Sequence, residues 1–343
     1  MKKALLFIAS GIILASCSKT EIEQAAVTSP VDELDMKIVY YLTGDGEDVE
    51  TPTEGGTVLM GGSTDVDAAF EWMIDRSGGG DFVVIRVTGE DGYNQYIYDM
   101  GGLNSVETIV INTVSSANSM GVYNRIINAE ALFIAGGDQW NYVNIWKGTL
   151  VEDAINYLIN TKHAPVGGTS AGEAIMGDGY FDAMNGTVTS EGALNNPYKD
   201  RVSIQYDNFI ENPWLKNTIC DQHYIGREGR HLTFMARLST DYGITVKGIG
   251  VDEETAACID EDGHVQVFGI NNAYFCRQTN LAPEGCVSGH ELTWKRGEQA
   301  VTVYKVPGTL TGDNTFELSD WATGSGGTWG YFWAFKGEFH STF

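Results

Sequence analysis

The chain has 343 residues, 43% of them hydrophobic, and its 46 acidic and 21 basic side chains give a formal net charge of −25. This length and composition suffice for the buried core of one large domain. So acidic a surface repels nucleic acid and anionic lipid headgroups, which excludes nucleic-acid-binding proteins as a class.

The N-terminus has the pattern of an export signal. Two lysines precede an apolar run, residues 4–15, that is too short for a comfortable membrane span. The run ends in Leu-Ala-Ser-Cys17, which resembles a bacterial lipobox and implies that Cys17 becomes the lipidated first residue of the mature protein. We predict a lipoprotein signal peptide over 1–17, with an ordinary cleaved signal as the alternative, and an acidic tether over 18–35. The protein is then exported and lipid-anchored to the bacterial cell envelope, at the outer membrane or the periplasmic face.

Short apolar strands alternate with helical patterns through the first half of the chain. In chain order we expect a strand at 57–60, a helix over 66–76, strands at 81–85, 108–112 and 131–135, a helix over 151–159 and a strand at 164–166. This rhythm predicts an α/β domain over residues 36–270, a three-layer sandwich whose mainly parallel sheet has helices on both faces. In such sheets the site lies at the carboxyl ends of the strands.

The pattern changes after about residue 260, where strand-like runs are separated by Gly, Asn and Asp turns. We predict a β-rich C-terminal extension over 271–343 that packs on the same domain. Three tryptophans, Trp321, Trp329 and Trp333, fall within thirteen residues of it. They cap the core, or they form a carbohydrate- or peptide-binding face of exposed aromatics.

Four cysteines remain besides Cys17. Cys220 and Cys258 lie in apolar runs and are expected to be small core residues. Cys276 and Cys286 flank a turn-like segment, and whether they pair outside the cytoplasm stays open because spacing does not fix disulfide geometry. No Cys or His cluster has the spacing of a metal site, so we expect no metal and no cofactor.

The most informative segment is Gly168-Thr169-Ser170-Ala171-Gly172, a serine between two glycines where an apolar strand gives way to a helix. This is the G-x-S-x-G pattern of a nucleophile elbow, a strained turn that tolerates little bulk beside the serine. The helix N-terminus beside it favours developing negative charge. Ser170 is therefore a candidate nucleophile, and a plain glycine-rich turn is the alternative.

A serine nucleophile needs a base to take its proton. His223 follows an apolar strand that ends in Asp221-Gln222, so it is expected at the strand end on the side of the elbow. His163 precedes the elbow strand and should lie at the opposite end of the sheet. His231, on the helix that follows, is the local competitor.

Four segments, in order and at similar spacing, resemble the cyanophycinase-like serine peptidases, a family that includes dipeptidase E and has a fold related to class I glutamine amidotransferases. They are Ala135-Gly136-Gly137-Asp138-Gln139, the elbow, Asp221-Gln222-His223-Tyr224 and residues 248–256 (Gly-Ile-Gly-Val-Asp-Glu-Glu-Thr-Ala). The resemblance covers roughly residues 55–320 and implies a flavodoxin-like α/β fold.

The resemblance implies a serine peptidase that cuts near aspartyl residues, with Ser170 as nucleophile and His223 as general base and acid. It places the oxyanion hole at the backbone N–H groups of Gly137 and Ala171. It assigns substrate binding to Gln139, Gln222 and Asp221. It is also compatible with a homodimer. A glutamine amidotransferase fits poorly, because those enzymes carry cysteine at the elbow.

The third member of the triad lies, in the family, between the nucleophile and the histidine. Glu191 is our first candidate for this acid, Asp200 the second and Asp182 the third. An acid in this place orients the imidazole and stabilises its cation.

Arg227 and Arg230 follow His223, and the fork of an arginine suits a carboxylate of the substrate. Helix-surface ion pairing, for example with Glu228, is the alternative. The family usually has three arginines here, spaced R-x-R-x-x-R, and this chain lacks the middle one. Glu173 occupies a position where the family more often has a small residue. Three roles stay open for it: it narrows the substrate pocket, it favours a cationic group of the substrate, or it is an acid at a helix N-terminus that the helix dipole stabilises.

The sequence thus predicts a lipid-anchored serine peptidase that hydrolyses aspartate-containing peptide or isopeptide bonds through an acyl-enzyme at Ser170. The alternative is a non-catalytic peptide- or glycan-binding lipoprotein on the same scaffold.

Overall fold

The computed structural model describes residues 38–279 and 281–343. The predicted signal peptide with Cys17 and the tether over 18–35 lie outside the described residues. The described residues form one compact unit. No helix within the described ranges is long and apolar enough to cross a membrane.

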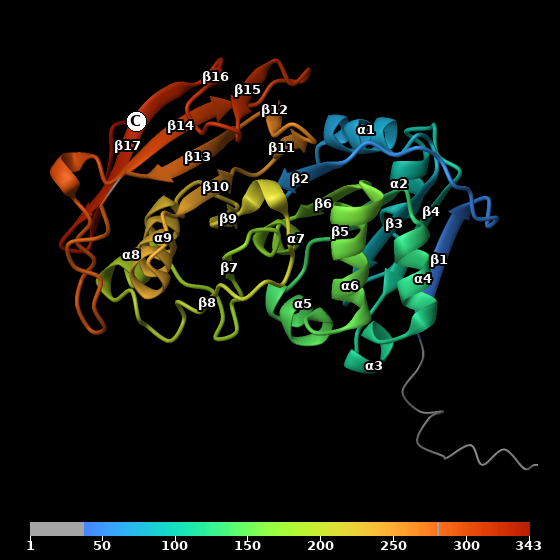
Figure 1. Cartoon of the computed structure of the whole chain (residues 1–343), viewed down its shortest axis with the longest axis horizontal. Helices are drawn as coiled ribbons and strands as arrows, with labels where there is room; N and C mark the ends of the chain where they lie inside the picture. The colour runs from blue at the N-terminus through green and yellow to red at the C-terminus, as the bar shows by residue number, and fades with distance from the viewer. Residues whose placement is uncertain (1–37, 280) are drawn as a thin grey trace, which may run out of the picture. The chain divides into compact units, whose positions relative to one another are not determined.

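A ten-stranded mixed sheet forms the larger part of the fold (Figure 1). Its strands, in spatial order, are β1 (Val39–Gly44), β4 (Ser105–Val110), β3 (Asp81–Arg86), β5 (Ala131–Ile134), β6 (Pro165–Thr169), β2 (Gly56–Met60), β11 (Thr255–Asp260), β12 (His264–Gly269), β15 (Asn314–Glu317) and β16 (Gly324–Ser325). The block from β4 to β2 is parallel, and every other pairing is antiparallel.

A second sheet has six strands in the order β18 (Glu338–Ser341), β17 (Thr328–Phe335), β14 (Val301–Pro307), β13 (Asn272–Gln278), β10 (Lys247–Val251) and β9 (Thr218–Gln222). Only β9 and β10 are parallel, and α9 (Glu228–Tyr242) connects them. The prediction of a mainly parallel sheet was therefore wrong. Short connections such as the turn between β11 and β12 force antiparallel pairing, because a parallel crossover needs a dozen or more residues.

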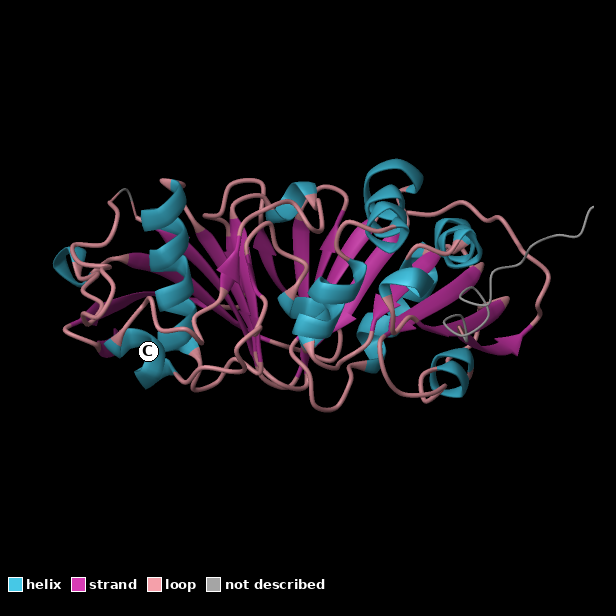
Figure 2. Cartoon of the chain, turned by 90° about the horizontal axis from the view of Figure 1, so that it is seen from below, coloured by secondary structure: helices cyan, strands magenta, loops and turns pink. Residues whose placement is uncertain are grey.

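Helices pack on the larger sheet (Figure 2). They do so through two separate apolar clusters of buried side chains. One cluster joins the sheet to α1 (Asp67–Arg76) and α2 (Asn94–Tyr98), with Phe70 against Phe133 at a ring separation of 4.7 Å. The other joins it to α4 (Met120–Asn128), α5 (Gln139–Trp146) and α6 (Leu150–Tyr157). The apolar spacing predicted for 151–159 is the buried side of α6 and of the helical turn Leu158–Lys162.

Shorter elements complete the fold. They are α3 (Val114–Ala117), α7 (Ala171–Ala174), α8 (Ser190–Asn195), the two-stranded pair β7 (Tyr180–Phe181) and β8 (Ile204–Gln205), and 3-10 turns at Pro213–Leu215 and Arg296–Glu298. The C-terminal strands divide between the sheets, with β15 and β16 ending one and β13, β14, β17 and β18 forming most of the other.

The four cysteines of the described chain are all free and buried. Cys220 and Cys258 are core residues, as predicted. Cys276 lies 3.9 Å from the Tyr224 hydroxyl, and among the described residues neither it nor Cys286 forms a disulfide. Their pairing, left open by the sequence, is therefore not seen.

Candidate active site

Ser170 sits at a sharp turn between β6 and α7. Its backbone angles are φ 51° and ψ −111°, a left-handed conformation that a residue with a side chain rarely adopts. A Cβ on Gly168 would lie 2.6 Å from the backbone carbon of Gly172, and a Cβ on Gly172 would lie 2.2 Å from the carbonyl oxygen of Ile134. Both glycines are needed because the elbow packs backbone against backbone.

Replacement of Gly172 by alanine is expected to lower the free energy of unfolding by about 1–3 kcal/mol, because the new methyl overlaps the β5 backbone. Urea denaturation measures this loss. Gly92→Ala is the matched control, since a Cβ at Gly92 meets nothing within 4 Å. Equal stability of Gly172→Ala and Gly92→Ala would contradict the packing described for the elbow.

The His223 imidazole faces the serine. Its Nε2 lies 2.7 Å from the Ser170 Oγ, so Nε2 can accept the hydroxyl proton when Nδ1 carries the ring hydrogen. The backbone N–H of His223, just past the end of β9, donates to the Gly61 carbonyl at 2.8 Å. A Cβ on Gly62 would lie 2.5 Å from the imidazole Cε1. The loop after β2 thus holds the histidine against the elbow, and only glycine fits beside it.

Glu253 is the carboxylate on the other side of the imidazole. Its Oε1 lies 2.7 Å from His223 Nδ1, and its side chain is 47% exposed against 24% for the histidine. Glu253 lies in the turn between β10 and β11, and β10 runs parallel to β9, so both residues leave the same edge of the sheet.

The three acids chosen from the sequence do not occupy this place. Glu191 is exposed on the first turn of α8, and Asp200 is exposed in the loop that follows. Asp182 is buried, where it accepts from the Met184 N–H and the Gln205 amide. The choice of Glu191 as the group that orients His223 is therefore corrected to Glu253. A signal for it was present, because three acidic residues, 252–254, directly follow the strand-like run 248–251.

A cavity of about 350 Å³ opens beside the Ser170 hydroxyl. It gathers most of the residues predicted for the site: Gly137, Gln139, Ser170, Gln222, His223, Arg227 and Arg230 line it, together with Asp138, Ala183, Gly186 and Thr187. Ala171 begins α7 directly after the serine. Within the described residues, the N–H groups of Gly137 and Ala171 donate to no backbone or side-chain acceptor, as donors reserved for an oxyanion would.

The two arginines play different parts. Arg230 is 1% exposed and forms a bidentate ion pair with the buried Asp221. Its Nε donates to Asp221 Oδ2 at 2.9 Å and its Nη2 donates to Asp221 Oδ1 at 2.5 Å. Asp221, predicted to bind substrate, is thus occupied by Arg230. The Arg227 guanidinium donates only to the Gln222 carbonyl and amide oxygens, at 3.2 Å and 3.4 Å, and no carboxylate lies within 4.0 Å of it in the described chain. Burial and the neighbouring Arg230 lower the pKa of Arg227.

Glu173, three residues after the nucleophile, is completely buried. Neither carboxyl oxygen has a hydrogen-bond partner among the described residues. Burial, and secondarily the nearby Asp221, raises the pKa of this carboxyl well above its usual range, although Arg227 opposes the shift. The group is therefore held neutral, which fits neither a cation-binding role nor a charged helix cap.

The neutral state of Glu173 predicts a pH dependence of stability. In the unfolded chain the Glu173 carboxyl has a pKa near 4.5, so above this pH it loses its proton, whereas the folded chain keeps it. The contribution of Glu173 to the free energy of unfolding therefore falls as the pH rises. Glu173→Gln should therefore stabilise the protein at pH 8 relative to wild type and change it much less at pH 4.5. Urea denaturation at both pH values tests this, with exposed Glu191→Gln as control. A stability difference that is independent of pH would contradict a buried neutral carboxyl.

His231 does not compete with His223 for the serine. It is fully buried on α9, where its Nδ1 lies 2.9 Å from the Tyr224 hydroxyl and its Nε2 lies 3.1 Å from the Ile219 carbonyl. His163, as predicted, follows the helical turn before β6, at the opposite end of that strand from Ser170.

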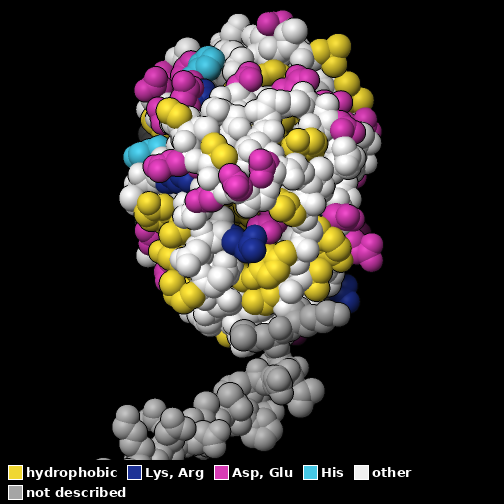
Figure 3. All heavy atoms as spheres, turned by 90° about the vertical axis from the view of Figure 1, so that its right-hand side faces the viewer, with side chains coloured by type: hydrophobic (Ala, Val, Ile, Leu, Met, Phe, Trp, Pro, Cys, Tyr) yellow, Lys and Arg dark blue, Asp and Glu magenta, His cyan; other side chains and the backbone are white. Residues whose placement is uncertain are grey.

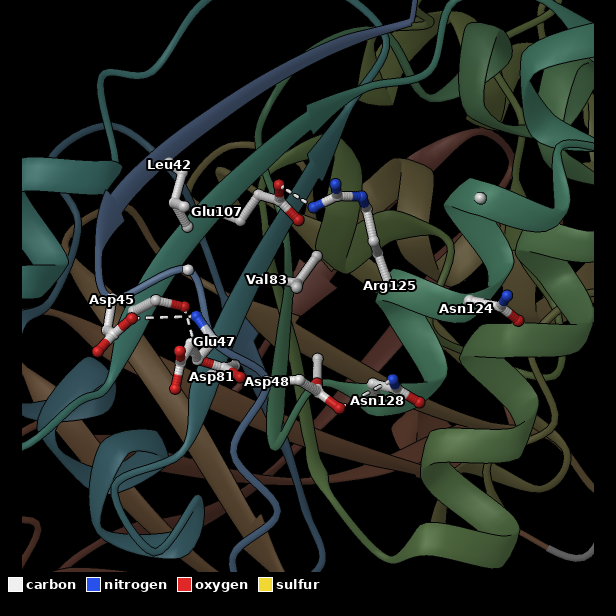
Figure 4. Close-up of a pocket in the computed structure, with 14 residues that line it drawn as sticks. Leu42, Asp45, Glu47, Asp48, Asp81, Val83, Glu107, Asn124, Arg125 and Asn128 are labelled. Atoms are coloured by element: carbon white, nitrogen blue, oxygen red, sulfur yellow. Dashed lines mark hydrogen bonds and ion pairs between the residues drawn. The ribbon is translucent and has the colours of Figure 1, made fainter.

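A different cavity lies at the β1 end of the larger sheet (Figures 3 and 4). In the close-up, Arg125 reaches toward Glu107, while Asp45, Glu47 and Asp81 lie together at the lower side of the cavity. No histidine or cysteine lines it, and the described chain contains no cluster of three metal-ligating side chains.

Comparison with known proteins identifies the family of the chain. The family model described as peptidase family S51 matches residues 86–267, more than half of the chain and a range that contains Ser170, His223 and Glu253. Cyanophycinase of Trichormus variabilis is 26% identical over 187 residues, which cover 54% of this chain and 57% of that protein. Cyanophycinase of Synechococcus elongatus is 24% identical over 179 residues, 52% of this chain and 50% of that protein. The chain thus spans about half the length of the curated relatives it matches.

Solved structures show a weaker likeness. The crystal structure of a peptidase from an acI-B1 Actinobacterium has a TM-score of 0.45 and 15% identity, covering 69% of this chain and 98% of that chain. A putative peptidase E protein from Listeria monocytogenes EGD-e has a TM-score of 0.41 and 16% identity, covering 64% of this chain and 100% of that chain. On the family match, this chain belongs to peptidase family S51.

Proposed function

We propose that the protein is a serine peptidase that hydrolyses aspartate-containing peptide or isopeptide bonds through an acyl-enzyme at Ser170. The observation that carries the proposal is the continuous chain of contacts from Ser170 Oγ to His223 Nε2, and from His223 Nδ1 to Glu253, at 2.7 Å each. A purely binding protein has no need for a nucleophile and a base at this separation.

The reaction follows from these contacts. Ser170 Oγ attacks the carbonyl carbon while its proton passes to His223 Nε2, and Glu253 stabilises the imidazolium that forms. The N–H groups of Gly137 and Ala171 receive the oxyanion. The tetrahedral intermediate expels the amine, which takes the proton from His223, and leaves the acyl-enzyme. A water molecule then gives its proton to His223, attacks the ester, and releases the acid and the free serine.

Arg227 supports a substrate that carries a carboxylate. Its guanidinium lines the cavity beside Ser170 without a carboxylate partner in the described chain, and an arginine fork binds carboxylates with two hydrogen bonds. Gln139 and Gln222, on the same cavity, supply amide donors and acceptors for the substrate backbone. The similar cyanophycinases support the same class of bond.

Mass spectrometry of digests tests the proposal. The chain would be incubated with cyanophycin and a pool of α- and β-aspartyl peptides, together with Ser170→Ala. Ser170-dependent products are expected, with Arg227→Gln raising KM at least tenfold for substrates with a free carboxylate and leaving kcat nearly unchanged. Arg201→Gln, an exposed arginine elsewhere, is the matched control. Specific retention of a peptide by both proteins without cleavage would instead favour the binding lipoprotein.

We further propose that Cys17 anchors the protein in the bacterial envelope by its lipid. Metabolic labelling with a radioactive fatty acid is expected to label the wild-type chain and not Cys17→Ala. An unlabelled wild-type chain would contradict the lipid anchor and favour an ordinary signal peptide that is cleaved without lipidation.

A further inference from the structure

The second sheet carries a cross-strand row of polar side chains that do not line the cavity beside Ser170. The register pairs Lys247 with Arg277, Arg277 with Thr302, and Thr302 with Tyr331, across β10, β13, β14 and β17. Directly paired residues project to the same face of a sheet. All four are partly exposed. We call this set the cationic row.

An aromatic stripe crosses the end of this row along β17. Trp329, Tyr331 and Trp333 alternate with buried residues, so they share one face at a spacing of about 7 Å. Trp329, 44% exposed, packs on Tyr304 at a ring separation of 4.6 Å. Trp333 stacks nearly flat on His340, with 14° between the ring planes. The aromatic stripe (Trp329, Tyr331 and Trp333) is thus held in place by its neighbours while keeping accessible surface.

The donors of the cationic row lack acceptors. Within the described residues, neither the Arg277 guanidinium nor the Lys247 ammonium forms a hydrogen bond or has a carboxylate within 4.0 Å. Burial, then the charge of its cross-strand partner Arg277, lowers the pKa of Lys247. Lys247 lies 5.0 Å from the ring of Trp321, whose buried indole N–H also has no acceptor in the described chain.

Asp320 lies within reach of the Arg277 charge. The hydrogen bonds of its own turn, and then that charge, lower the pKa of its carboxyl, but it forms no ion pair within 4.0 Å in the described chain. Asp320 accepts hydrogen bonds from the Ala322 and Thr323 N–H groups and from the Thr323 hydroxyl, within its own turn. Glu338 lies beyond the row, on β18 opposite Phe335. In a chain with a net charge of −25, two adjacent cations with no carboxylate within 4.0 Å in the described chain form a local site for an anion.

We propose that this face binds an acidic sugar chain. The C–H faces of its pyranose rings stack on the aromatic stripe, and its carboxylate or sulfate groups pair with Arg277 and Lys247. Stacking on the stripe alone suits a neutral glycan, and the cationic row alone suits any anion. Tyr331 belongs to both the cationic row and the aromatic stripe and joins them into one surface. This surface favours a ligand that has both sugar rings and negative charges. Three strands, β14, β13 and β10, separate the stripe on β17 from β9 (Figure 1). Lys247 of the row pairs with Thr218 at the start of β9, at the opposite end of that strand from Gln222 and His223, so binding leaves the catalytic cavity open.

Affinity electrophoresis of the purified full chain tests the proposal. Native gels containing polygalacturonate or chondroitin sulfate should retard the chain, and gels containing dextran should not. Arg277→Gln and Trp333→Ala should each weaken binding at least fivefold, with Tyr157→Ala, an exposed aromatic on α6, as the matched control that binds like wild type. Arg277→Gln keeps the fold testable, because its guanidinium holds no partner that would be left unpaired.

Three results would overturn the proposal. The first is the absence of retardation by every acidic polysaccharide while circular dichroism shows a folded chain. The second is retention of full binding by Arg277→Gln and Trp333→Ala, which would place the ligand elsewhere. The third is binding to poly-aspartate but to no polysaccharide, which would make the face a peptide surface.

Discussion

Replacement of Ser170 by alanine is expected to lower kcat on any cleaved aspartyl peptide by roughly 10⁴- to 10⁶-fold, while the fold persists. The change removes the nucleophile itself. His223 and Glu253 act together with that nucleophile and contribute little to the rate without it. The donors at Gly137 and Ala171 stay in place, so a small residual rate above that of water is expected. Steady-state kinetics measures the loss, and thermal unfolding checks that the variant is folded.

Ser63→Ala provides a matched control for this experiment. Ser63 is an exposed serine on the neighbouring loop, also at a left-handed backbone position with φ 68°. It should retain activity within about twofold of wild type, because among the described residues the His223 ring is hydrogen-bonded to Ser170 and Glu253 and not to Ser63. Wild-type-like cleavage by Ser170→Ala would mean that hydrolysis does not pass through this serine.

Glu253→Gln is expected to lower kcat by about 10²- to 10⁴-fold with little change in KM. The amide carries no charge to balance the imidazolium, and it can present its NH₂ group to Nδ1, which favours the wrong tautomer of His223. Because the Glu253 side chain is 47% exposed, water replaces part of the lost stabilisation. Presteady-state measurement of the acylation rate isolates the step concerned.

Two other glutamate variants are compared with Glu253→Gln. Glu191→Gln tests the acid first chosen from the sequence, and Glu254→Gln tests the neighbour that lines a different cavity. Both variants should keep kcat within a few-fold of wild type. A large loss in Glu191→Gln together with a mild effect of Glu253→Gln would show that the loop carrying Glu191 rearranges to reach the histidine.

The elbow and the histidine were accessible to sequence reasoning because their signals are local. Glycines two residues on each side of Ser170 specify a crowded turn, and the apolar run before His223 specifies a strand end. The acid was missed because its position depends on the order of strands. Glu253 follows His223 by 30 residues and becomes its neighbour only because β10 pairs with β9 in parallel.

For a similar reason, only the parallel block of the larger sheet could be predicted from the sequence. The alternation of strands and helices through β6 identifies the parallel block, since each crossover has its own helix. Beyond β10 the pairing depends on tertiary contacts that periodicity does not encode. The apolar run of β11 returns antiparallel beside β2, and the later strands are shared between both sheets. The burial of Glu173 was equally hidden, because an acid in the first turn of a helix is usually exposed.

Covalent labelling with a fluorophosphonate, read by intact-protein and peptide mass spectrometry, tests the central claim most directly. Reaction with this probe requires an activated serine and no knowledge of the natural substrate. The account predicts a single adduct on Ser170 in the wild-type chain, labelling strongly slowed in His223→Ala, and none in Ser170→Ala. No adduct on Ser170, or labelling that is equally fast without His223, would contradict a serine activated by this histidine.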